Sequence, residues 1–449
     1  MIMPYISNTK SDQEEMLKLI GVRSIDELID IPSELRLKRP LNLPASVSEI
    51  ELRKEMLRLS ETNGDLDHYI SFLGAGAYDH YIPAVVAQMI SRSEFYTSYT
   101  PYQAEASQGT LQAIYEYQTM ICRITGMDVA NASMYDAASA LAEAALMASR
   151  ITGRKKVIVS RSINPNYRAV VKTYLSGLEI PVVEIPVHNG AADLEILKKE
   201  MDGGSACFMI QHPNFFGCLE EVTEMSEIVH RMGALLVVMV DPISLGILKP
   251  PGEMGADIVL GEGQGMGIPV AFGGPYLGLF ASKREFLRQM PGRIVGATID
   301  DKGRRGFCLT LQTREQHIKR ERATSNICTN ENLTALAALV YLAIMGKNGL
   351  SEVGRLCISN AAYARSRISG IGGFSPLFDR PFFKEFAVRT PSSPSGLLDK
   401  LLERKIIGGL DLSGLYPELG NAMLISVTEK RSREDIDCLV SAIKEAIRT

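Results

Sequence analysis

The residues from 256 to 276 constrain the fold of this chain most, because they join a short apolar strand to a glycine-rich loop. They read ADIVLGEGQGMGIPVAFGGPY, with an expected strand at Asp257–Leu260 and a second apolar run at Ile268–Phe272. Upstream of this strand, a purely apolar run, Leu235–Val240, ends in Asp241. Strands that are buried on both faces read as continuous apolar runs. Leu235–Val240 and Asp257–Leu260 are therefore predicted to be buried strands of a parallel sheet.

Strands and helices alternate through the middle of the chain. The expected strands are Lys156–Ser160, Val182–Ile185, Ala206–Gln211, Leu235–Val240 and Asp257–Leu260. The expected helices between them are Asn164–Leu175, Ala192–Lys199 and Thr223–Met232. This alternation predicts an α/β fold with a mostly parallel sheet and helices on both faces, whose ligands bind beyond the carboxyl ends of the strands. We expect the side chains that follow these strands to converge: Asp241, Gln264, His212 and Asn214.

The order of these two strands resembles the large domain of aspartate-aminotransferase-like enzymes, the fold type I pyridoxal-phosphate-dependent transferases. In that fold an Asp pairs with the protonated pyridine nitrogen of the cofactor, and a Lys after the second strand forms the Schiff base. Asp241 is present here, but Gln264 stands where the Lys is expected. A carboxamide cannot form an imine. The chain thus resembles a cofactor fold without its own nucleophile, around a vestigial pocket formed by Asp241, His212 and Asp136.

An alanine-rich helix is expected after residue 136, with Ser133 and Asp136 as its cap candidates. In this fold the start of such a helix holds the cofactor phosphate on free backbone N–H groups. An ordinary capped helix that packs tightly through small side chains explains the same residues equally well.

The segment from 71 to 110 is rich in Gly, Tyr and Pro, which is unusual for a surface connection. It carries Tyr96, Tyr99, Gln103 and Glu105. Long irregular loops in compact domains are often functional, so this loop is a candidate pocket wall. The alternative is a partly buried loop whose tyrosines serve packing. Further on, the cluster Arg304–Arg305 is expected to lie on a solvated face.

Three segments divide the chain. Residues 1–70 are expected to form a helical N-terminal segment, residues 71–345 the large domain, and residues 346–449 a small C-terminal α+β domain. In the first segment, Ser11 with Glu14 and Ser48 with Glu51 have the spacing of capping boxes, and Gly21 is expected to end the first helix. The strands Phe382–Val388 and Ala422–Val427 and the helices Ser395–Glu403 and Ser432–Ile447 are expected in the small domain.

Composition excludes several classes of function. The net charge of −4 argues against nucleic acid as a partner, because such proteins usually carry a basic patch. The seven scattered cysteines form no CxxC pair, which indicates reduced thiols and a cytoplasmic location. The N-terminus has no signal-peptide pattern, and no run approaches the roughly 18 apolar residues that span a membrane. The six histidines lack paired-ligand spacing, so no metal site is expected.

Three long motifs resemble one family over residues 71–329, with a looser match at both ends. They read YTPYQAEASQGTLQAIYEYQTMICRITGMDVANAS, GEGQGMGIPVAFGGPYLG and GRRGFCLTLQTREQHIKRERATSNICT. They resemble the alpha subunit (subunit 1) of the two-chain glycine dehydrogenase (decarboxylating), the P-protein of the glycine cleavage system. The resemblance implies decarboxylation of glycine and transfer of its aminomethyl group to the lipoyl arm of the H-protein, with pyridoxal phosphate as electron sink.

The same resemblance implies an α2β2 assembly in which the Schiff-base Lys belongs to subunit 2, so that this chain alone is inactive. By analogy with related enzymes, a loop of this chain would reach the phosphate of the cofactor on the partner. That loop is assigned to Thr324, Ser325 and Asn326, and the wall near the substrate to Tyr96, Tyr99, Gln103 and Glu105.

Two other functions compete with this one. A stand-alone pyridoxal-phosphate enzyme, a desulfurase or an aminotransferase, would need its Lys elsewhere, and Lys283 is the nearest candidate. A purely structural subunit would stabilise the partner without contributing to chemistry.

Overall fold

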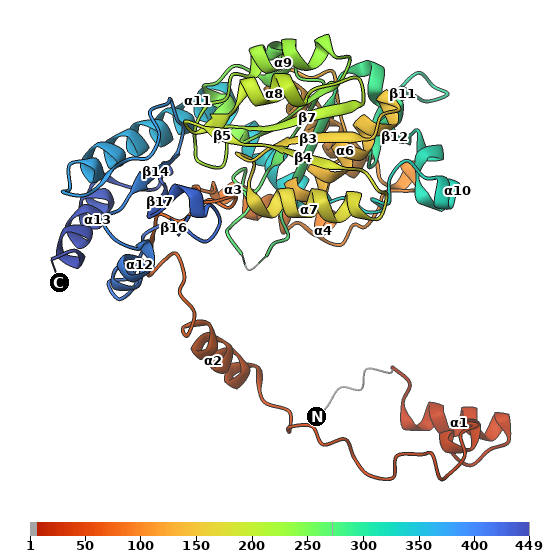
Figure 1. The fold of residues 1–449 in the computed structure, drawn as a ribbon. Coiled ribbons are helices and arrows are strands. Elements are labelled where there is room, and N and C mark those ends of the chain that lie inside the picture. The colour runs from red at the N-terminus through yellow and green to blue at the C-terminus, as the bar shows by residue number, and fades with distance from the viewer. Residues whose placement is uncertain (1–6, 272, 449) are drawn as a thin grey trace. The chain divides into compact units, whose positions relative to one another are not determined.

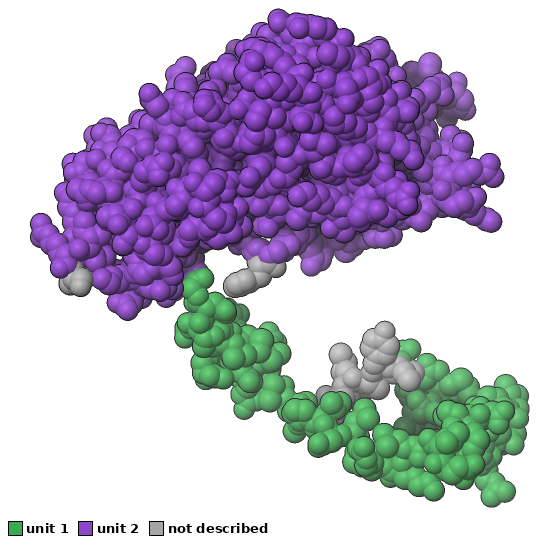
Figure 2. Space-filling model, in the orientation of Figure 1, with its two compact units in different colours: residues 1–64 green, residues 65–449 purple. Residues whose placement is uncertain are grey.

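The computed structural model describes residues 7–271 and 273–448 of the chain. They belong to two compact units, Met1–Gly64 and Asp65–Thr449 (Figures 1 and 2). Phe272, which ends the second apolar run of the sequence, lies outside the described residues. Residues 268–271 of that run form neither helix nor strand.

The first unit contains two helices, α1 (Lys10–Ile20) and α2 (Glu49–Ser60), and a 3₁₀ turn at Ile25–Leu28. Helix α1 begins earlier than the pair Ser11 and Glu14 predicted, because Thr9 and Asp12 form the capping box. Gly21 ends α1 with φ +89°, and Ser48 with Glu51 caps α2, as predicted. None of the described residues of this unit is buried.

A seven-stranded sheet forms the centre of the second unit, in the order β2–β10–β9–β8–β7–β3–β4. The five strands from β9 to β4 in this order run parallel, and β10 is antiparallel to both of its neighbours. The bounds are β2 Val129–Ala130, β3 Lys156–Ser160, β4 Val182–Ile185, β7 Ser205–His212, β8 Leu235–Val240, β9 Ile258–Glu262 and β10 Gly278–Ser282. The mostly parallel α/β sheet predicted from the alternating segments is confirmed.

Helices cover both faces of the sheet, as Figure 1 shows. Neighbouring strand residues face opposite sides, so Val157 and Val159 join the core beneath α6, whereas Ile158 joins the core on the other face. All three are fully buried, which explains why the middle of β3 is apolar on both faces. The helices are α3 Ala84–Ile90, α4 Ser93–Tyr96, α5 Gln108–Thr125, α6 Ala137–Thr152, α7 Pro165–Ser176, α8 Leu194–Glu200, α9 Val222–Arg231, α10 Gln316–Lys319 and α11 Asn332–Ser369.

The sequence did not predict the hairpin of β11 (Ile294–Ile299) and β12 (Arg305–Thr310). Charged residues fill the turn between the two strands (Asp300, Asp301, Lys302 and Arg304), and the apolar alternation within the strands is short. Phe307 and Leu309 are buried against Leu111 of α5. Arg305 is exposed, but its guanidinium lies over the rings of Tyr115 and Phe307. A second small hairpin joins β5 (Val187–His188) to β6 (Ala191–Ala192).

An antiparallel sheet in the order β13–β14–β17–β16 forms the C-terminal part of the second unit. Its strands are β13 Ser375–Pro376, β14 Glu385–Arg389, β16 Leu410–Asp411 and β17 Ala422–Ser426, covered by α12 Pro394–Leu402 and α13 Arg433–Ala446. Strand β1 (Ile70–Ser71) pairs in parallel with β15 (Ile406–Ile407). The predicted domain boundary at 345/346 coincides with Gly346, which interrupts α11 with φ +57°. The division of the second unit into large and small domains stays a prediction.

Helix α11 is long and apolar enough to cross a membrane by length and composition alone, the only such helix among the described residues. The sequence analysis expected no apolar run long enough to span a membrane and therefore did not predict this helix. A core helix meets the same criteria, and Leu336, Ala338 and Tyr341 of α11 lie in the core beside the sheet. We therefore interpret α11 as a core helix.

We predict that Gly217→Ala disrupts the second unit. Gly217 has φ +80°, and a Cβ there would lie 1.8 Å from the backbone oxygen of Glu385. The clash and the left-handed backbone together should cost about 3 kcal/mol or more of the free energy of unfolding. The control is Gly177→Ala, where φ is −72° and no atom lies within 4 Å of the added Cβ. Thermal unfolding should show a large loss for Gly217→Ala alone, and equal midpoints for the two variants would contradict the expected clash.

Candidate functional site

A small cavity of about 20 Å³ lies at the carboxyl ends of β7, β8 and β9. We call it the Asp241 cavity. The side chains that line it include Tyr78, Gln211, Asp241, Glu262, Gln264 and Lys384. Parallel strands end at the same edge of a sheet, which is why the residues that follow β8 and β9 meet here.

Gln264 uses its whole carboxamide in hydrogen bonds to backbone groups. Its Oε1 accepts from the N–H of Tyr78 at 2.8 Å, and its Nε2 donates to the carbonyls of Tyr78 and Ile268 at 3.0 and 2.7 Å. An ammonium has no acceptor, so a Lys could not take the Tyr78 N–H in the same way. Gln264 therefore ties the segment around Tyr78 to the end of β9.

Asp241 forms an ion pair that the sequence did not reveal. Its Oδ2 lies 2.7 Å from Nζ of Lys384, whose side chain is only 2% exposed, and its Oδ1 accepts from the N–H of Ile243. Lys384 immediately precedes β14, far from β8 in the sequence. No local pattern marks a pair of this separation, so only the fold reveals it.

His212 and Asn214 turn to Glu220 rather than to the Asp241 cavity. His212 Nδ1 accepts from the N–H of Glu220 at 3.1 Å, and Asn214 Nδ2 donates to Oε1 of Glu220 at 2.8 Å. The expected convergence therefore brings together Asp241 and Gln264. His212 and Asn214 belong to a separate buried polar group.

Asp136 caps α6, where its Oδ1 accepts from the N–H of Ser139 at 2.7 Å. The first N–H of the helix, that of Ala137, donates to Oε2 of Glu262 at 3.1 Å. Glu262 also accepts from the N–H groups of Leu277 and Gln264. Burial raises the pKa of Glu262 to about 8, against the opposing effect of these backbone donors. In this fold the start of such a helix can hold a cofactor phosphate. Here a side chain of the same protein, Glu262, occupies the start of α6.

Pyridoxal phosphate does not fit the Asp241 cavity. Ligand pockets usually measure about 300–1,000 Å³, whereas a cavity of about 20 Å³ holds roughly one water molecule. Gln264 supplies no amine, and Asp241 is already paired with Lys384. The Asp241 cavity therefore lacks both the space and the amine that this cofactor needs.

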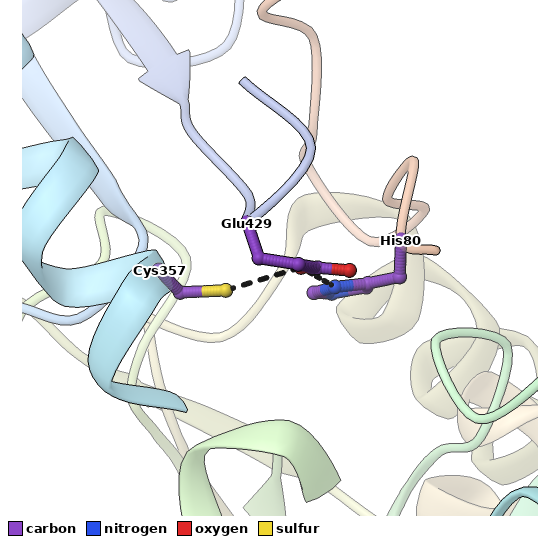
Figure 3. A group of neighbouring side chains, drawn as sticks. All are labelled: His80, Cys357 and Glu429. Carbon is purple, nitrogen blue, oxygen red and sulfur yellow. Dashed lines mark hydrogen bonds and ion pairs between the residues drawn. The ribbon is translucent and has the colours of Figure 1, made fainter. Parts of the chain in front are cut away.

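His80, Cys357 and Glu429 come from three separate segments and point toward one another beside the Asp241 cavity (Figure 3). His80 Nδ1 lies 2.7 Å from the Glu429 carboxylate, and Cys357 Sγ donates to the same carboxylate at 3.4 Å. Burial raises the pKa of the Cys357 thiol well above its ordinary value, so the sulfur keeps its proton and donates to Glu429. We interpret the group as a hydrogen-bond network. The expected absence of a metal stays a prediction.

Two exposed loops carry the residues assigned to the partner's site. Tyr96 and Tyr99 are 69% and 75% exposed, and Gln103 and Glu105 are also exposed. Thr324 and Ser325 are half-buried, and Asn326 is exposed. The Tyr99 hydroxyl lies 3.3 Å from Oγ1 of Thr329, so the two loops lie side by side.

Arg293, which no sequence pattern marked, holds the segment from Tyr96 to Glu105, which we call the tyrosine loop. It is 3% exposed and donates to the Tyr102 hydroxyl at 2.9 Å and to Thr100 Oγ1 at 3.2 Å. Its guanidinium also lies over the ring of Tyr102 and near Glu315. Because Glu315 immediately precedes α10, this buried cation connects the tyrosine loop to the start of α10.

The loop from 323 to 326 is held by both backbone and side-chain hydrogen bonds. The N–H of Thr324 donates to the carbonyl of Arg314 at 3.0 Å, and Ser325 Oγ accepts from the N–H of Ile327 at 3.1 Å. The Thr324 hydroxyl forms no hydrogen bond to another described residue. This hydroxyl is thus available to an external group.

Comparison with known proteins identifies the family. The model of the glycine cleavage system P-protein family matches residues 3–443. The chain belongs to the glycine cleavage system P-protein family. It is 56% identical over 442 residues to a probable glycine dehydrogenase (decarboxylating) subunit 1 of Carboxydothermus hydrogenoformans, covering 98% of this chain and 99% of that relative. A relative of the same name from Desulforamulus reducens is 54% identical with the same coverage.

Solved structures agree with this membership of the P-protein family. The chain matches a crystal structure of glycine decarboxylase (P-protein) of the glycine cleavage system, in inhibitor-bound form, with 43% identity and a TM-score of 0.91, over 99% of this chain and 100% of that one. A NifS-like protein at 16% identity and a TM-score of 0.64, over 85% of this chain and 99% of that one, shows the fold alone. The fold is fold type I of the pyridoxal-phosphate-dependent transferases, as the sequence predicted.

We predict that His212 makes the stability of this P-protein family member depend on pH. Burial lowers the pKa of His212 to about 4 from 6.5, so the folded imidazole stays neutral while the unfolded one takes up a proton. Stability is therefore full above pH 6.5 and falls as the pH drops from 6.5 to 4, by up to about 1.4 kcal/mol per pH unit.

His212→Asn keeps an acceptor for the Glu220 N–H and removes the titrating group. Denaturant unfolding at a series of pH values should show that this variant loses less stability as the pH falls. The difference corresponds to at most one fewer proton taken up on unfolding. His188→Asn, at an exposed histidine, is the control and should leave the slope unchanged. If the free energy of unfolding of His212→Asn depends on pH as steeply as that of the unaltered chain, His212 is not the source of the pH dependence.

Proposed function

We propose that this chain acts as subunit 1 of a two-chain glycine dehydrogenase (decarboxylating) and completes an active site whose cofactor is held by subunit 2. The main support is the Asp241 cavity, whose described lining residues offer a fully bonded carboxamide at Gln264 and a paired cation at Lys384 but no free amine. The names and high identities of the P-protein relatives support the same function.

The assembled enzyme would decarboxylate glycine and transfer the aminomethyl group to the lipoyl arm of the H-protein. Pyridoxal phosphate, bound covalently to the partner subunit, would supply the electron sink when bound. The tyrosine loop of this chain would limit water access and orient the substrate, and the 323–326 loop would contact the phosphate. An α2β2 assembly in the cytoplasm completes this proposal.

The exposed position of both loops supports their use by a partner. The side chains of Tyr96, Tyr99 and Asn326 are exposed rather than packed in a core. The buried Arg293 nevertheless holds the tyrosine loop through a hydrogen bond to Tyr102. A hollow of about 690 Å³ between α3, α5 and α11 adds apolar surface, with Val85 37% and Ile344 58% exposed. Large exposed apolar surfaces commonly mark interfaces.

A stand-alone enzyme that uses Lys283 is not supported by the topology. Lys283 follows β10, whose last residue, Ser282, pairs with Ile258 at the start of β9. Lys283 therefore lies at the opposite end of β9 from Gln264, and it forms an ion pair with Asp257. Its amine cannot reach the Asp241 cavity from the far edge of the sheet.

The function is tested by co-expressing this chain with the candidate subunit 2 and assaying exchange between glycine and CO₂. We expect exchange by the pair and none by this chain alone, because this chain lacks a free amine at the cofactor position. Exchange by this chain without the partner would overturn the proposal.

The variant Thr324→Ala tests whether this chain contributes to the partner's site. Loss of one hydrogen bond to a charged phosphate costs about 1.5–3 kcal/mol, so pyridoxal phosphate should dissociate roughly tenfold or more readily from the assembled enzyme. Thr324→Ser, which keeps the hydroxyl, is the matched control and should retain the cofactor.

Cofactor retention is followed by absorbance during dialysis, with assembly checked by size-exclusion chromatography. A purely structural role for this chain predicts normal retention and exchange activity for both Thr324 variants whenever the pair assembles. That result would favour a scaffold subunit over shared catalysis.

A further inference from the structure

The buried Lys384 is fully satisfied without any ligand. An ammonium has three N–H donors. Lys384 Nζ lies 2.7 Å from Asp241 Oδ2, 2.9 Å from His80 Nε2, and 3.4 Å from the centroid of the Tyr78 ring. A carboxylate, a ring nitrogen and an aromatic face thus all contact the cation.

The surrounding groups fix the state of His80. Its Nδ1 faces the Glu429 carboxylate, which can only accept, so Nδ1 carries a proton. Its Nε2 faces the Lys384 ammonium, which can only donate, so Nε2 carries none. In this tautomer Nε2 of His80 contributes an acceptor to the lysine. The network from Glu429 through His80 and Lys384 to Asp241 is complete within this chain.

A second observation concerns the start of α6. The N–H of Ala137, at the start of α6, donates to Glu262, a residue that also lines the Asp241 cavity. Helix starts of this kind bind phosphate through free N–H groups. Here the first donor of the helix is already taken by a side chain.

We propose that Lys384 and Glu262 are internal substitutes for the cofactor, so that this chain's own pocket is closed to pyridoxal phosphate whichever residue stands at position 264. In fold type I enzymes the Asp pairs with the protonated ring nitrogen of the cofactor. Lys384 presents a positive N–H group to Asp241 in its place. Glu262 accepts from the helix start in place of a phosphate. This inference goes beyond the proposed function, which concerns the partner's site.

The proposal explains why the cavity measures only about 20 Å³ in a fold that elsewhere holds a substituted pyridine ring. Loss of the Schiff-base amine alone would leave an empty pocket. The ion pair instead fills it and connects the end of β8 to the start of β14.

The first test is a double-mutant cycle in the full-length chain, using Lys384→Met, Asp241→Asn and the double variant. Lys384→Met leaves Asp241 unpaired, so its thermal midpoint should fall, and Asp241→Asn should recover part of the loss in that background. Lys198→Met with Glu195→Gln, at an exposed ion pair, is the control cycle and should show no coupling. Additive losses at Lys384 and Asp241 would overturn the proposal.

The second test asks whether the pocket accepts the cofactor. The full-length chain and its Gln264→Lys variant are incubated with pyridoxal phosphate, reduced with borohydride, and mapped by peptide mass. We expect label on exposed lysines such as Lys198, and none above that background at Lys384 or position 264. Label above background at Lys384 in the unaltered chain, or at position 264 in the variant, would overturn the proposal. Because both tests use this chain alone, they are independent of the exchange assay on the assembled pair.

Discussion

The ion pair between Asp241 and Lys384 is a buried charge interaction that links the two sheets of the second unit. It joins the carboxyl end of β8 in the parallel sheet to the start of β14 in the C-terminal sheet. Removal of one partner from a buried pair typically costs about 3–5 kcal/mol, because the other charge stays buried without compensation. Lys384 also contacts Nε2 of His80 at 2.9 Å, so the same lysine links a third segment to the two sheets.

The same pair determines what chemistry this chain can perform. A fold type I sheet positions an Asp for a cofactor, but here a lysine of the same chain satisfies that Asp. The ordered yet exposed surface lies elsewhere, on the tyrosine loop and the 323–326 loop. Arg293 organises the first of these loops through Thr100 and Tyr102. The closed pocket and the two exposed loops both support the proposed role of this chain, which is to complete the active site of a partner subunit.

Much of the fold could be predicted from local patterns. Strands β3, β4 and β8 have the predicted bounds. In β8 every residue is apolar and buried, which leaves little choice of where the strand begins. The hairpin of β11 and β12 was missed, since its buried residues Phe307 and Leu309 are separated by residues of mixed character. The capping box of α1 was placed at Ser11 instead of Thr9, because neighbouring polar residues offer several equivalent spacings.

The candidate site was only partly predictable. Asp241 and Gln264 were placed together correctly because both follow parallel strands. His212 follows a neighbouring strand, yet its ring turns to Glu220, a choice that depends on side-chain packing. Arg293 and Lys384 carried no sequence signal, because a single cation in a charged or aromatic segment has many possible partners.

The sequence by itself determined the class of fold, the absence of a Schiff-base lysine at position 264 and the resemblance to the P-protein family. These properties depend on local periodicity and residue identity, which are read directly along the chain. Only the tertiary structure decided that the Asp241 cavity is closed, because Lys384 and Tyr78 reach it from segments distant in sequence. Contacts between such segments depend on how the whole chain packs, and no local pattern encodes them.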